Sequence, residues 1–376
     1  MLCDVDLDTP DATRTHTVEV ARNFALESFL VDLIARGLDP VIAGVRYHQA
    51  GGSEAQRLRR IAGINLRSLL VLWRCRQSAS RFYVRHHWSN VPAMLAGRLL
   101  GYRVVTQVDD VQYGRSYEPD IGFLSDHVKR LAARLMGRLA HGVVAVTPQI
   151  KGLLVDQFKV PAERVAVLPN GVDIGFFHPL SRAEAIARAG LDPSYRYVVF
   201  TGRFQPWVDF DTLLEAFAIV ACEQADARLI LVGDGPEREQ VEQIVRRLGI
   251  GDSVVITGLV RDRAVVRDFL GAATVTLSAN RSEYRASIGV SPVKLAEYLA
   301  SGRAVVATDL PGLREAIEET GAGVVVSANP RAVAEAIIDL LDPARADELG
   351  TSGRRVAEEH YAWCSIVRRT LPLFGA

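Results

Sequence analysis

An excess of either charge, paired cysteines and long apolar runs are all missing from this chain of 376 residues. Lys+Arg and Asp+Glu both number 44. Nucleic-acid binders usually carry a basic excess, so we expect no nucleic-acid partner. The four cysteines are far apart and form no CxxC pair. This argues against a structural zinc site and predicts reduced thiols in a cytoplasmic protein.

Membrane-spanning and export signals are also missing from the sequence. No run reaches the roughly 18 apolar residues that a spanning helix needs. The acidic first residues lack the basic and apolar regions of a signal peptide. The sequence therefore predicts no transmembrane segment, leaves a peripheral membrane contact open, and gives no indication of the oligomeric state.

Short β-branched runs alternate with longer amphipathic segments along the chain, a pattern typical of parallel sheets covered by helices on both faces. Two such series predict two doubly wound α/β domains, 1–178 and 179–357, with the ligand site in the cleft between their sheets. The first strand has few apolar residues, so we expect it to be short or irregular. The predicted strands are 69–72, 82–84, 103–108, 142–146, 165–168, 197–201, 228–232, 253–257, 275–278, 304–308 and 323–326.

The segment 285–302 carries the most informative pattern. Ser291 followed by Pro292 predicts a helix N-cap with proline at the first helical position. Gly289 would let the backbone approach a ligand, and the helix N-terminus suits a diphosphate. Lys294 and Glu297 share one face of the predicted helix. On spacing alone, an ordinary capped helix with an exposed Lys/Glu pair fits equally well.

The pattern Ser-Pro-x-Lys-x-x-Glu-Tyr-x-Ala-x-Gly at 291–302 resembles the donor-binding segment of family 4 glycosyltransferases. This resemblance implies the GT-B fold: two Rossmann-like domains facing each other across a cleft, with a C-terminal helix of about 358–376 packed back on the first domain. Further passages match in order from about residue 80, namely 83–85, 144–148, 167–173, 177–179, 200–203, 231–236, 258–260, 304–308, 311–312 and 360–363.

Family membership would imply transfer with retention of configuration, a nucleotide sugar as co-substrate, and no bound metal or other cofactor. Without a metal, cations and N–H groups must stabilise the leaving diphosphate. Arg203 matches the phosphate-binding arginine, and Lys294 would assist it; these are the predicted catalytic residues. Donor contacts are implied for Gly202, Val260, Arg261, Gly289, Val290, Ser291 and Glu297.

Two positions depart from the family pattern. Val208 stands where a lysine is common, and Gly289 stands where a glutamate is common. Lys294 is the best substitute for the missing cation, with Arg281 and Arg285 in reserve. We interpret both changes as features of the branch that carries the Ser-Pro-x-Lys-x-x-Glu form.

The acceptor site is expected in the first half of the chain, where the sequence gives weaker indications. Arg14 and His16 are predicted to lie in a loop before a helix that begins near Val18. The pair Asp109–Asp110 follows the strand 103–108, and His86 follows another strand end. Each group also has a structural alternative. Arg14 and His16 could belong to a polar cluster that caps the helix, Asp109–Asp110 could form a turn, and the segment after His86 could pack in the core.

The resulting prediction is a retaining hexosyltransferase that moves a sugar from an NDP-sugar, with UDP as the expected nucleotide, to a small hydrophilic acceptor. An aminocyclitol acceptor in antibiotic or other natural-product biosynthesis would fit the polar acceptor side. Two alternatives stay open: an NDP-sugar epimerase or hydrolase on the same fold, and a catalytically degenerate GT-B binding partner.

Overall fold

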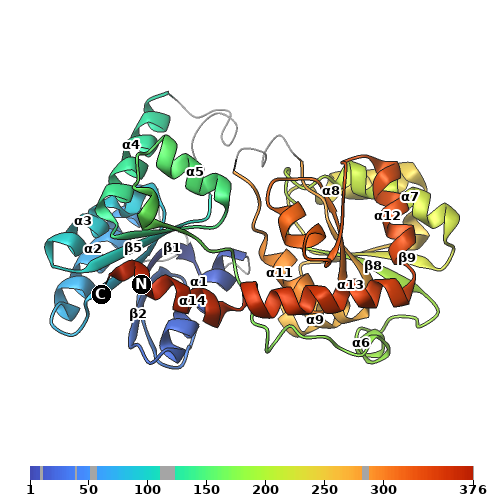
Figure 1. Cartoon of the computed structure of the whole chain (residues 1–376), viewed down its shortest axis with the longest axis horizontal. Coiled ribbons are helices and arrows are strands. Elements are labelled where there is room, and N and C mark those ends of the chain that lie inside the picture. The colour runs from blue at the N-terminus through green and yellow to red at the C-terminus, as the bar shows by residue number, and fades with distance from the viewer. Residues whose placement is uncertain (9–11, 39, 51–56, 111–122, 282–287, 376) are drawn as a thin grey trace. The chain divides into compact units, whose positions relative to one another are not determined.

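The computed structural model describes residues 1–8, 12–38, 40–50, 57–110, 123–281 and 288–375 (Figure 1). The chain divides into an N-terminal unit, Met1–Gly171 with Trp363–Ala376, and a C-terminal unit, Val172–Ala362. The boundary between the units lies after Gly171, earlier than the predicted boundary after residue 178. The C-terminal segment that returns to the N-terminal unit begins at Trp363, later than the predicted residue 358. Contacts explain the earlier boundary: Arg354 Nη1 donates to the carbonyls of Ile174 and Phe177, which ties this stretch to the C-terminal unit.

The N-terminal unit is built on a seven-stranded parallel sheet of order β3-β2-β1-β4-β5-β6-β7. The strands before β4 are added toward one edge of the sheet and those from β4 onward toward the other, so the switch point lies between β1 and β4. Doubly wound sheets bind ligands at such a point, at the carboxyl ends of the strands. The strands are β1 (Leu2–Asp6), β2 (Val31–Arg36), β3 (Val45–Gln49), β4 (Arg81–Arg85), β5 (Arg103–Val108), β6 (Gly142–Ala145) and β7 (Val165–Val167).

Helices cover both faces of this sheet (Figure 1). The last helix comes from the end of the chain and packs on α1, with Trp363, Ile366 and Val367 in the core of the unit. The helices are α1 (Ala12–Leu26), α2 (Arg57–Cys75), α3 (Val91–Leu99), α4 (Phe123–Leu139), α5 (Pro148–Asp156) and α14 (Trp363–Thr370).

The C-terminal unit repeats the plan with a six-stranded parallel sheet of order β10-β9-β8-β11-β12-β13. Its switch point lies between β8 and β11. The strands are β8 (Arg196–Thr201), β9 (Ala227–Val232), β10 (Val254–Gly258), β11 (Ala273–Ser278), β12 (Ala304–Thr308) and β13 (Gly323–Val326). The helices are α6 (Arg182–Arg188), α7 (Phe210–Glu223), α8 (Arg238–Leu248), α9 (Arg263–Ala272), α11 (Val293–Ala300), α12 (Pro330–Leu340) and α13 (Pro343–Val356).

Alternation along the central strand explains its continuous apolar run. Val198 and Phe200 of β8 point into a core shared with α7, α8 and α12. Tyr197 and Val199 point into a second core shared with α6, α9 and α11. A strand buried on both faces has no solvent side, so the four central positions, Tyr197–Phe200, are all apolar.

Three expectations about elements need correction or completion. Leu69–Leu72 is not a strand but part of α2, where Leu69 and Leu70 are exposed and Val71 and Leu72 are buried, a pattern that fits a helix and not the strict alternation of a strand. Strands β2 and β3 were not predicted from the sequence. Strand β1 has five residues and a register shift between Leu2 and Asp6, so it is irregular, as expected.

Candidate functional site

Close backbone packing shapes the carboxyl end of β8. Gly202 follows the strand with φ +135°, and its N–H donates to the carbonyl of Val232 at 2.9 Å. A Cβ at Gly233 would lie 2.0 Å from the Gly202 oxygen, and one at Gly235 would lie 2.3 Å from the Phe204 oxygen. Only glycine fits at these two positions, because the loops after β8 and β9 touch through their backbones.

Helix α11 is anchored to the same strand end by Tyr298. The fully buried Tyr298 hydroxyl accepts a hydrogen bond from the Thr201 N–H at 2.8 Å. The predicted cap is displaced by one residue: Pro292 is the N-cap, no side chain caps the helix, and the first helical residue is Val293. Pro292 has an extended ψ of 131°, so the helix cannot include it. Ser291 therefore lies one residue further outside the helix than expected.

Lys294 projects from the first turn of α11 toward the end of β8. Its Nζ lies 4.0 Å from the centroid of the Phe200 ring, and its Cδ lies 3.7 Å from where a Gly202 Cβ would be. Burial lowers the pKa of Lys294 to about 7. At neutral pH the Lys294 amine is therefore protonated in only part of the molecules, and a nearby anion would favour its charged form.

Arg203 and Glu297 complete the predicted charged set. Arg203 directly follows Gly202 and is exposed, and no ion pair joins it to the residues that the structure describes. Glu297 lies one turn after Lys294 on α11 and is partly exposed. The structure therefore brings Gly202, Arg203 and Lys294 together at one strand end, with Glu297 on the adjoining helix.

The remaining predicted donor residues lie in loops at the carboxyl edge of the same sheet. Gly289 is buried and has φ +65°, a conformation that favours glycine. The Val290 N–H donates to the carbonyl of Pro311 at 3.3 Å, which joins this loop to the one after β12. Val260 and Arg261 follow β10; Val260 packs against the core, whereas Arg261 is exposed.

The two departures from the family pattern have different surroundings. Val208 is 3% exposed and packs in the core of α7, α8 and α12, so its position supplies no cation to a ligand. The reserve cation Arg281 donates to Asp211 at 2.8 Å and is already paired. Arg285 lies outside the described residues. Lys294 is therefore the best-placed substitute for the missing lysine among the predicted cations that the structure describes.

In the N-terminal unit, His16 and Asp109 are joined through Gln107. The Gln107 Nε2 contacts His16 Nε2 at 2.5 Å and donates to Asp109 Oδ1 at 2.6 Å, and the Tyr83 hydroxyl donates to Gln107 Oε1. Arg85 Nε donates to Asp109 Oδ2 at 2.5 Å. The network connects α1, β4 and β5 beside the switch point of the sheet.

Electrostatics fix the charge states in this network. Burial lowers the pKa of His16 to about 4, so the imidazole is neutral at neutral pH. Burial alone would raise the pKa of Asp109, but Arg85, His16 and the hydrogen bonds lower it to about 2. The Arg85–Asp109 pair thus stays ionised, and His16 accepts a hydrogen bond from Gln107 through Nε2.

The other predicted acceptor residues lie around this network. Helix α1 begins at Ala12, not near Val18, so Arg14 and His16 belong to a helix rather than a loop. Arg14 Nε donates to the Leu7 carbonyl at 2.7 Å, beside the end of β1. His86 directly follows β4. Its pKa is lowered to about 4, mainly by burial and to a smaller extent by the nearby His87. Asp110 is partly exposed next to Asp109.

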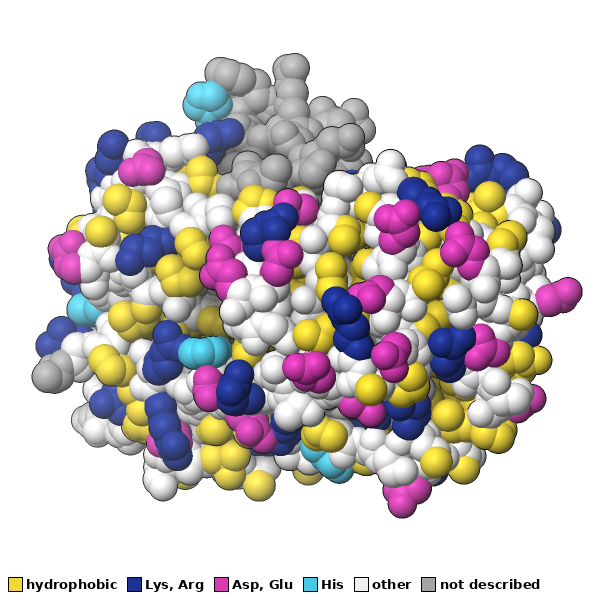
Figure 2. All heavy atoms as spheres, turned by 45° about the vertical axis from the view of Figure 1, so that its right-hand side comes forward, with side chains coloured by type: hydrophobic (Ala, Val, Ile, Leu, Met, Phe, Trp, Pro, Cys, Tyr) yellow, Lys and Arg dark blue, Asp and Glu magenta, His cyan; other side chains and the backbone are white. Residues whose placement is uncertain are grey.

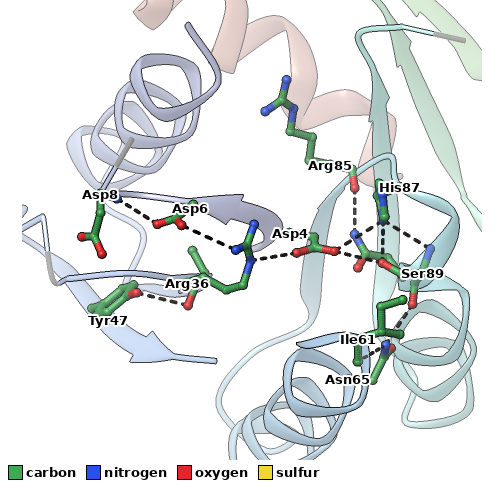
Figure 3. A network of polar contacts seen from close by, with 12 residues as sticks. Asp4, Asp6, Asp8, Arg36, Tyr47, Ile61, Asn65, Arg85, His87 and Ser89 are labelled. Atoms are coloured by element: carbon green, nitrogen blue, oxygen red, sulfur yellow. Dashed lines mark hydrogen bonds and ion pairs between the residues drawn. The ribbon is translucent and has the colours of Figure 1, made fainter. Parts of the chain in front are cut away.

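A second network, which the sequence did not predict, centres on the buried Asp4 of β1 (Figure 3). Its carboxylate accepts from Arg36 Nε and from Ser89 Oγ, both at 3.1 Å, and lies 3.4 Å from His87 Nδ1. Asn65 of α2 donates to the Ser89 carbonyl at 2.9 Å. These contacts hold the loop after β4 against β1 and β2, and so position Arg85 and His86.

Four residues important for these sites were missed: Tyr298, Arg85, Gln107 and Asp4. Each sits inside or next to a run already assigned to a strand or helix, so it was counted as part of that element. A polar residue in an otherwise apolar strand could have indicated them, because a buried polar side chain normally has a hydrogen-bond partner. Asp4 in β1 and Gln107 in β5 both show it.

A cavity of about 370 Å³ lies elsewhere in the N-terminal unit. It is lined by Met1, Val31 and Arg81, at the amino ends of β1, β2 and β4, and by Val71 and Leu72 of α2. It therefore opens at the opposite edge of the sheet from His16 and Asp109. Within the described ranges, no cluster of three or more His, Cys, Asp or Glu could hold a metal ion, and no helix is long and apolar enough to cross a bilayer.

Comparison with protein families assigns each unit separately. Residues 13–176 match the model described as "Glycosyltransferase Family 4", and residues 195–343 match "Glycosyl transferases group 1". The first match lies within the N-terminal unit apart from its last residues, and the second lies within the C-terminal unit.

Curated relatives are similar over part of their length. The chain is 32% identical over 217 residues to a D-inositol 3-phosphate glycosyltransferase of Segniliparus rotundus, covering 56% of this chain and 47% of that protein. It is 27% identical over 218 residues to a GDP-mannose-dependent alpha-(1-6)-phosphatidylinositol dimannoside mannosyltransferase of Mycobacterium tuberculosis, covering 58% and 54%. The chain thus spans about half the length of the curated relatives it matches.

Solved structures share the whole fold. A sucrose-phosphate synthase from Thermosynechococcus elongatus superposes with a TM-score of 0.76 at 20% identity, covering 99% of this chain and 97% of the other. HepE from Anabaena, in complex with UDP and glucose, gives 0.74 at 17% identity, covering 100% and 98%. Each unit of the chain thus matches a glycosyltransferase family model, and the chain as a whole has the GT-B fold.

Proposed function

We propose that this protein transfers a sugar from a nucleotide diphosphate to a small hydrophilic acceptor, with retention of anomeric configuration. The observation that carries the proposal is the meeting of Lys294 with Gly202 at the end of β8, beside the switch point of the C-terminal sheet. Doubly wound sheets bind nucleotides at this place. A glycosyltransferase domain covers the same residues.

The leaving diphosphate is the group that this edge would stabilise. Arg203 is exposed and can form two parallel hydrogen bonds to a phosphate. Lys294 gains its proton more readily once a diphosphate lies beside it, because the anion offsets the burial that lowers its pKa. Glu297 would accept hydrogen bonds from the ribose hydroxyls. No protein nucleophile is required for this scheme.

The donor nucleotide is proposed to be UDP. HepE, which shares the fold, was solved with UDP and glucose, whereas the mycobacterial relative is named for GDP-mannose. The exposed Arg261 and the partly buried Val260 follow β10 at the carboxyl edge, where the base would lie. Both nucleotides therefore belong in the first titration.

The proposed acceptor is a cyclitol or aminocyclitol, as used in natural-product biosynthesis. Several relatives are named for inositol 3-phosphate, which is the phosphate ester of a cyclitol. The N-terminal edge offers Asp109 and Asp110 as carboxylates and Arg14 as a cation. Polar groups of both signs suit a small polyol better than an acyl chain.

Calorimetric titration of the full chain with UDP, GDP, ADP and TDP tests the donor site. We expect micromolar binding of one nucleotide. Glu297→Ala should weaken it by about 1–3 kcal/mol through lost charge-assisted hydrogen bonds. Arg203→Ala should lower turnover by about a hundredfold, because it removes stabilisation of the leaving group. Glu348→Ala and Arg355→Ala, exposed residues on α13 of the same unit, are the matched controls.

The outcomes separate the alternatives. Unchanged binding and turnover in both variants would show that the donor site is assigned wrongly. No binding of any nucleotide would favour a degenerate GT-B partner. Turnover of the nucleotide sugar without an acceptor would favour a hydrolase or epimerase. Retention is tested by the anomeric coupling constant of the product in NMR, since an inverted anomer contradicts it.

A further inference from the structure

An acid-free stretch interrupts the balanced charge of this chain. Between Glu54 and Asp109 there is no aspartate or glutamate, although both acids and bases number 44 overall. The stretch includes α2, β4, α3 and β5. It contains ten arginines, namely Arg57, Arg59, Arg60, Arg67, Arg74, Arg76, Arg81, Arg85, Arg98 and Arg103.

Helix α2 turns apolar side chains to solvent as well as to the core. Ile64, Val71 and Leu72 are buried in the N-terminal unit. On the other side Leu66 is 61% exposed and Trp73 is 57% exposed, with Leu69 and Leu70 between them at helical spacing. A helix that is apolar on both sides normally has a partner on each.

The exposed apolar stripe continues on the neighbouring helices. Helix α2 packs against α3, and α3 packs against α4, on one side of the N-terminal unit (Figure 1). We call the exposed residues of these helices the α2–α4 face. Of sixteen exposed large apolar side chains that the structure describes, nine belong to it, whereas the whole C-terminal unit has three. The nine are Leu66, Leu69, Leu70, Trp73, Leu95, Leu99, Val128, Leu131 and Leu135.

Exposed arginines lie on or beside the same helices as these apolar side chains. Within the described ranges, no ion pair joins any of the six exposed arginines here to a carboxylate, namely Arg59, Arg74, Arg76, Arg98, Arg134 and Arg138. Arg76, just after α2, lies 4.3 Å above the ring of Trp73. Elsewhere acidic and basic side chains alternate, as Figure 2 shows for the face that it presents. The α2–α4 face thus combines apolar surface with positive charge that no carboxylate of the described residues neutralises.

We propose that the α2–α4 face docks the protein on an anionic lipid bilayer. Leucine and tryptophan side chains on a helix that lies along the surface enter the boundary between headgroups and acyl chains. Arginines beside them contact lipid phosphates, and their attraction adds to the burial of apolar area.

Two other occupants fit the chemistry less well. A second copy would bring arginines against arginines, with no carboxylate among the described residues of the face to pair them. Nucleic acid would engage the arginines but leave the exposed leucines and Val128 without apolar contacts, since base recognition uses stacking and hydrogen bonds. Of these three occupants, only a lipid surface uses both the charge and the aliphatic side chains.

Cosedimentation of the full chain with vesicles tests the proposal. We expect binding to phosphatidylcholine vesicles that contain phosphatidylglycerol, little binding to phosphatidylcholine alone, and release by high salt. The double variant Leu66→Gln/Trp73→Gln should lower the partition coefficient at least tenfold. Arg74→Gln/Arg134→Gln should weaken binding to the anionic vesicles selectively.

Matched controls come from the C-terminal unit. Val255→Gln removes an exposed apolar side chain and Arg355→Gln an exposed arginine, and neither should alter binding. Thermal melts verify that all variants are folded. Absence of vesicle binding, or equal losses in the control variants, would overturn the proposal. Binding to a DNA or RNA duplex without vesicle binding, or a dimer that Leu66→Gln/Trp73→Gln dissociates, would overturn it too.

Discussion

At the scale of single residues, Lys294 couples nucleotide binding to pH. Its pKa is lowered to about 7 by burial, so the amine is mostly neutral at pH 8 in the free protein. A bound diphosphate would favour the ammonium form, and binding should therefore take up a proton. We expect affinity for the nucleotide diphosphate to fall by up to about tenfold per pH unit above pH 7. Titrations in buffers of different ionisation enthalpy measure the uptake.

Lys294→Met should remove this pH dependence and most of the affinity. Lys151→Met on α5, in the other unit, serves as the control and should change neither. A wild-type affinity that is constant from pH 7 to 9 would contradict the role given to Lys294.

His16 should make the stability of the N-terminal unit depend on pH. Its pKa in the folded protein is about 4, below the ordinary value near 6.5, so the unfolded chain binds the extra proton between these values. The stabilisation is complete above pH 6.5 and is lost as the pH falls toward 4, by about 3 kcal/mol in all. His16→Gln cannot titrate and should lack this loss in urea unfolding between pH 7 and 4.

His360→Gln provides the comparison, because this histidine is exposed and lies in the C-terminal unit. Identical profiles for wild type and His16→Gln would mean that folding does not lower the pKa of His16. In that case the Gln107–His16 hydrogen bond is oriented differently.

At the scale of elements, one hydroxyl attaches helix α11 to strand β8. Tyr298→Phe would leave the buried N–H of Thr201 without this partner and should destabilise the C-terminal unit by about 1–3 kcal/mol. Calorimetry measures the shift of that unit's transition. Tyr195→Phe is the control, because Tyr195 is partly exposed and its ring can still stack on Arg228. Equal shifts for both variants would argue against the anchoring role.

Local pattern and tertiary contact contribute differently to α11. Its position and its Gly302 terminus could be predicted, because Gly302 adopts φ +64° just after the helix end. The cap could not, since Ser291 and Pro292 both favour helix starts and only the extended ψ of Pro292 separates them. Leu69–Leu72 was wrong for a related reason: a run of four apolar residues fits a strand or a helix equally until its burial is known.

At the scale of the whole molecule, the end of the chain completes the first unit. Trp363, Ile366, Val367 and Phe374 are buried in the N-terminal core. Deleting residues 363–376 exposes this core and should cost at least about 6 kcal/mol, which is comparable to the stability of a typical domain. Limited proteolysis should then digest the N-terminal unit and leave the C-terminal unit intact.

Arg369→Ala, an exposed substitution on α14, should leave the digestion pattern of the full chain unchanged. If the deletion variant resists proteolysis as well as the full chain does, the returning segment is not part of the N-terminal core.

The charge balance of the whole chain conceals its most uneven surface. Counting 44 bases against 44 acids correctly reports no net charge but hides the acid-free stretch between Glu54 and Asp109. The arginines of that stretch were visible in the sequence; the exposure of Leu66 and Trp73 beside them was not. Helical spacing cannot tell which of two apolar faces is covered, because coverage depends on segments elsewhere in the chain.

The sequence by itself determined the two parallel sheets, the segment around Lys294 and Glu297, and the glycines that the turns require. These follow from local chemistry: strands buried on both faces must be apolar, and left-handed turns favour glycine. The tertiary structure alone decided which side chains meet. Lys294 reaches Phe200, and Gln107 joins His16 to Asp109, because β–α crossovers bring the ends of distant segments to one edge of a sheet.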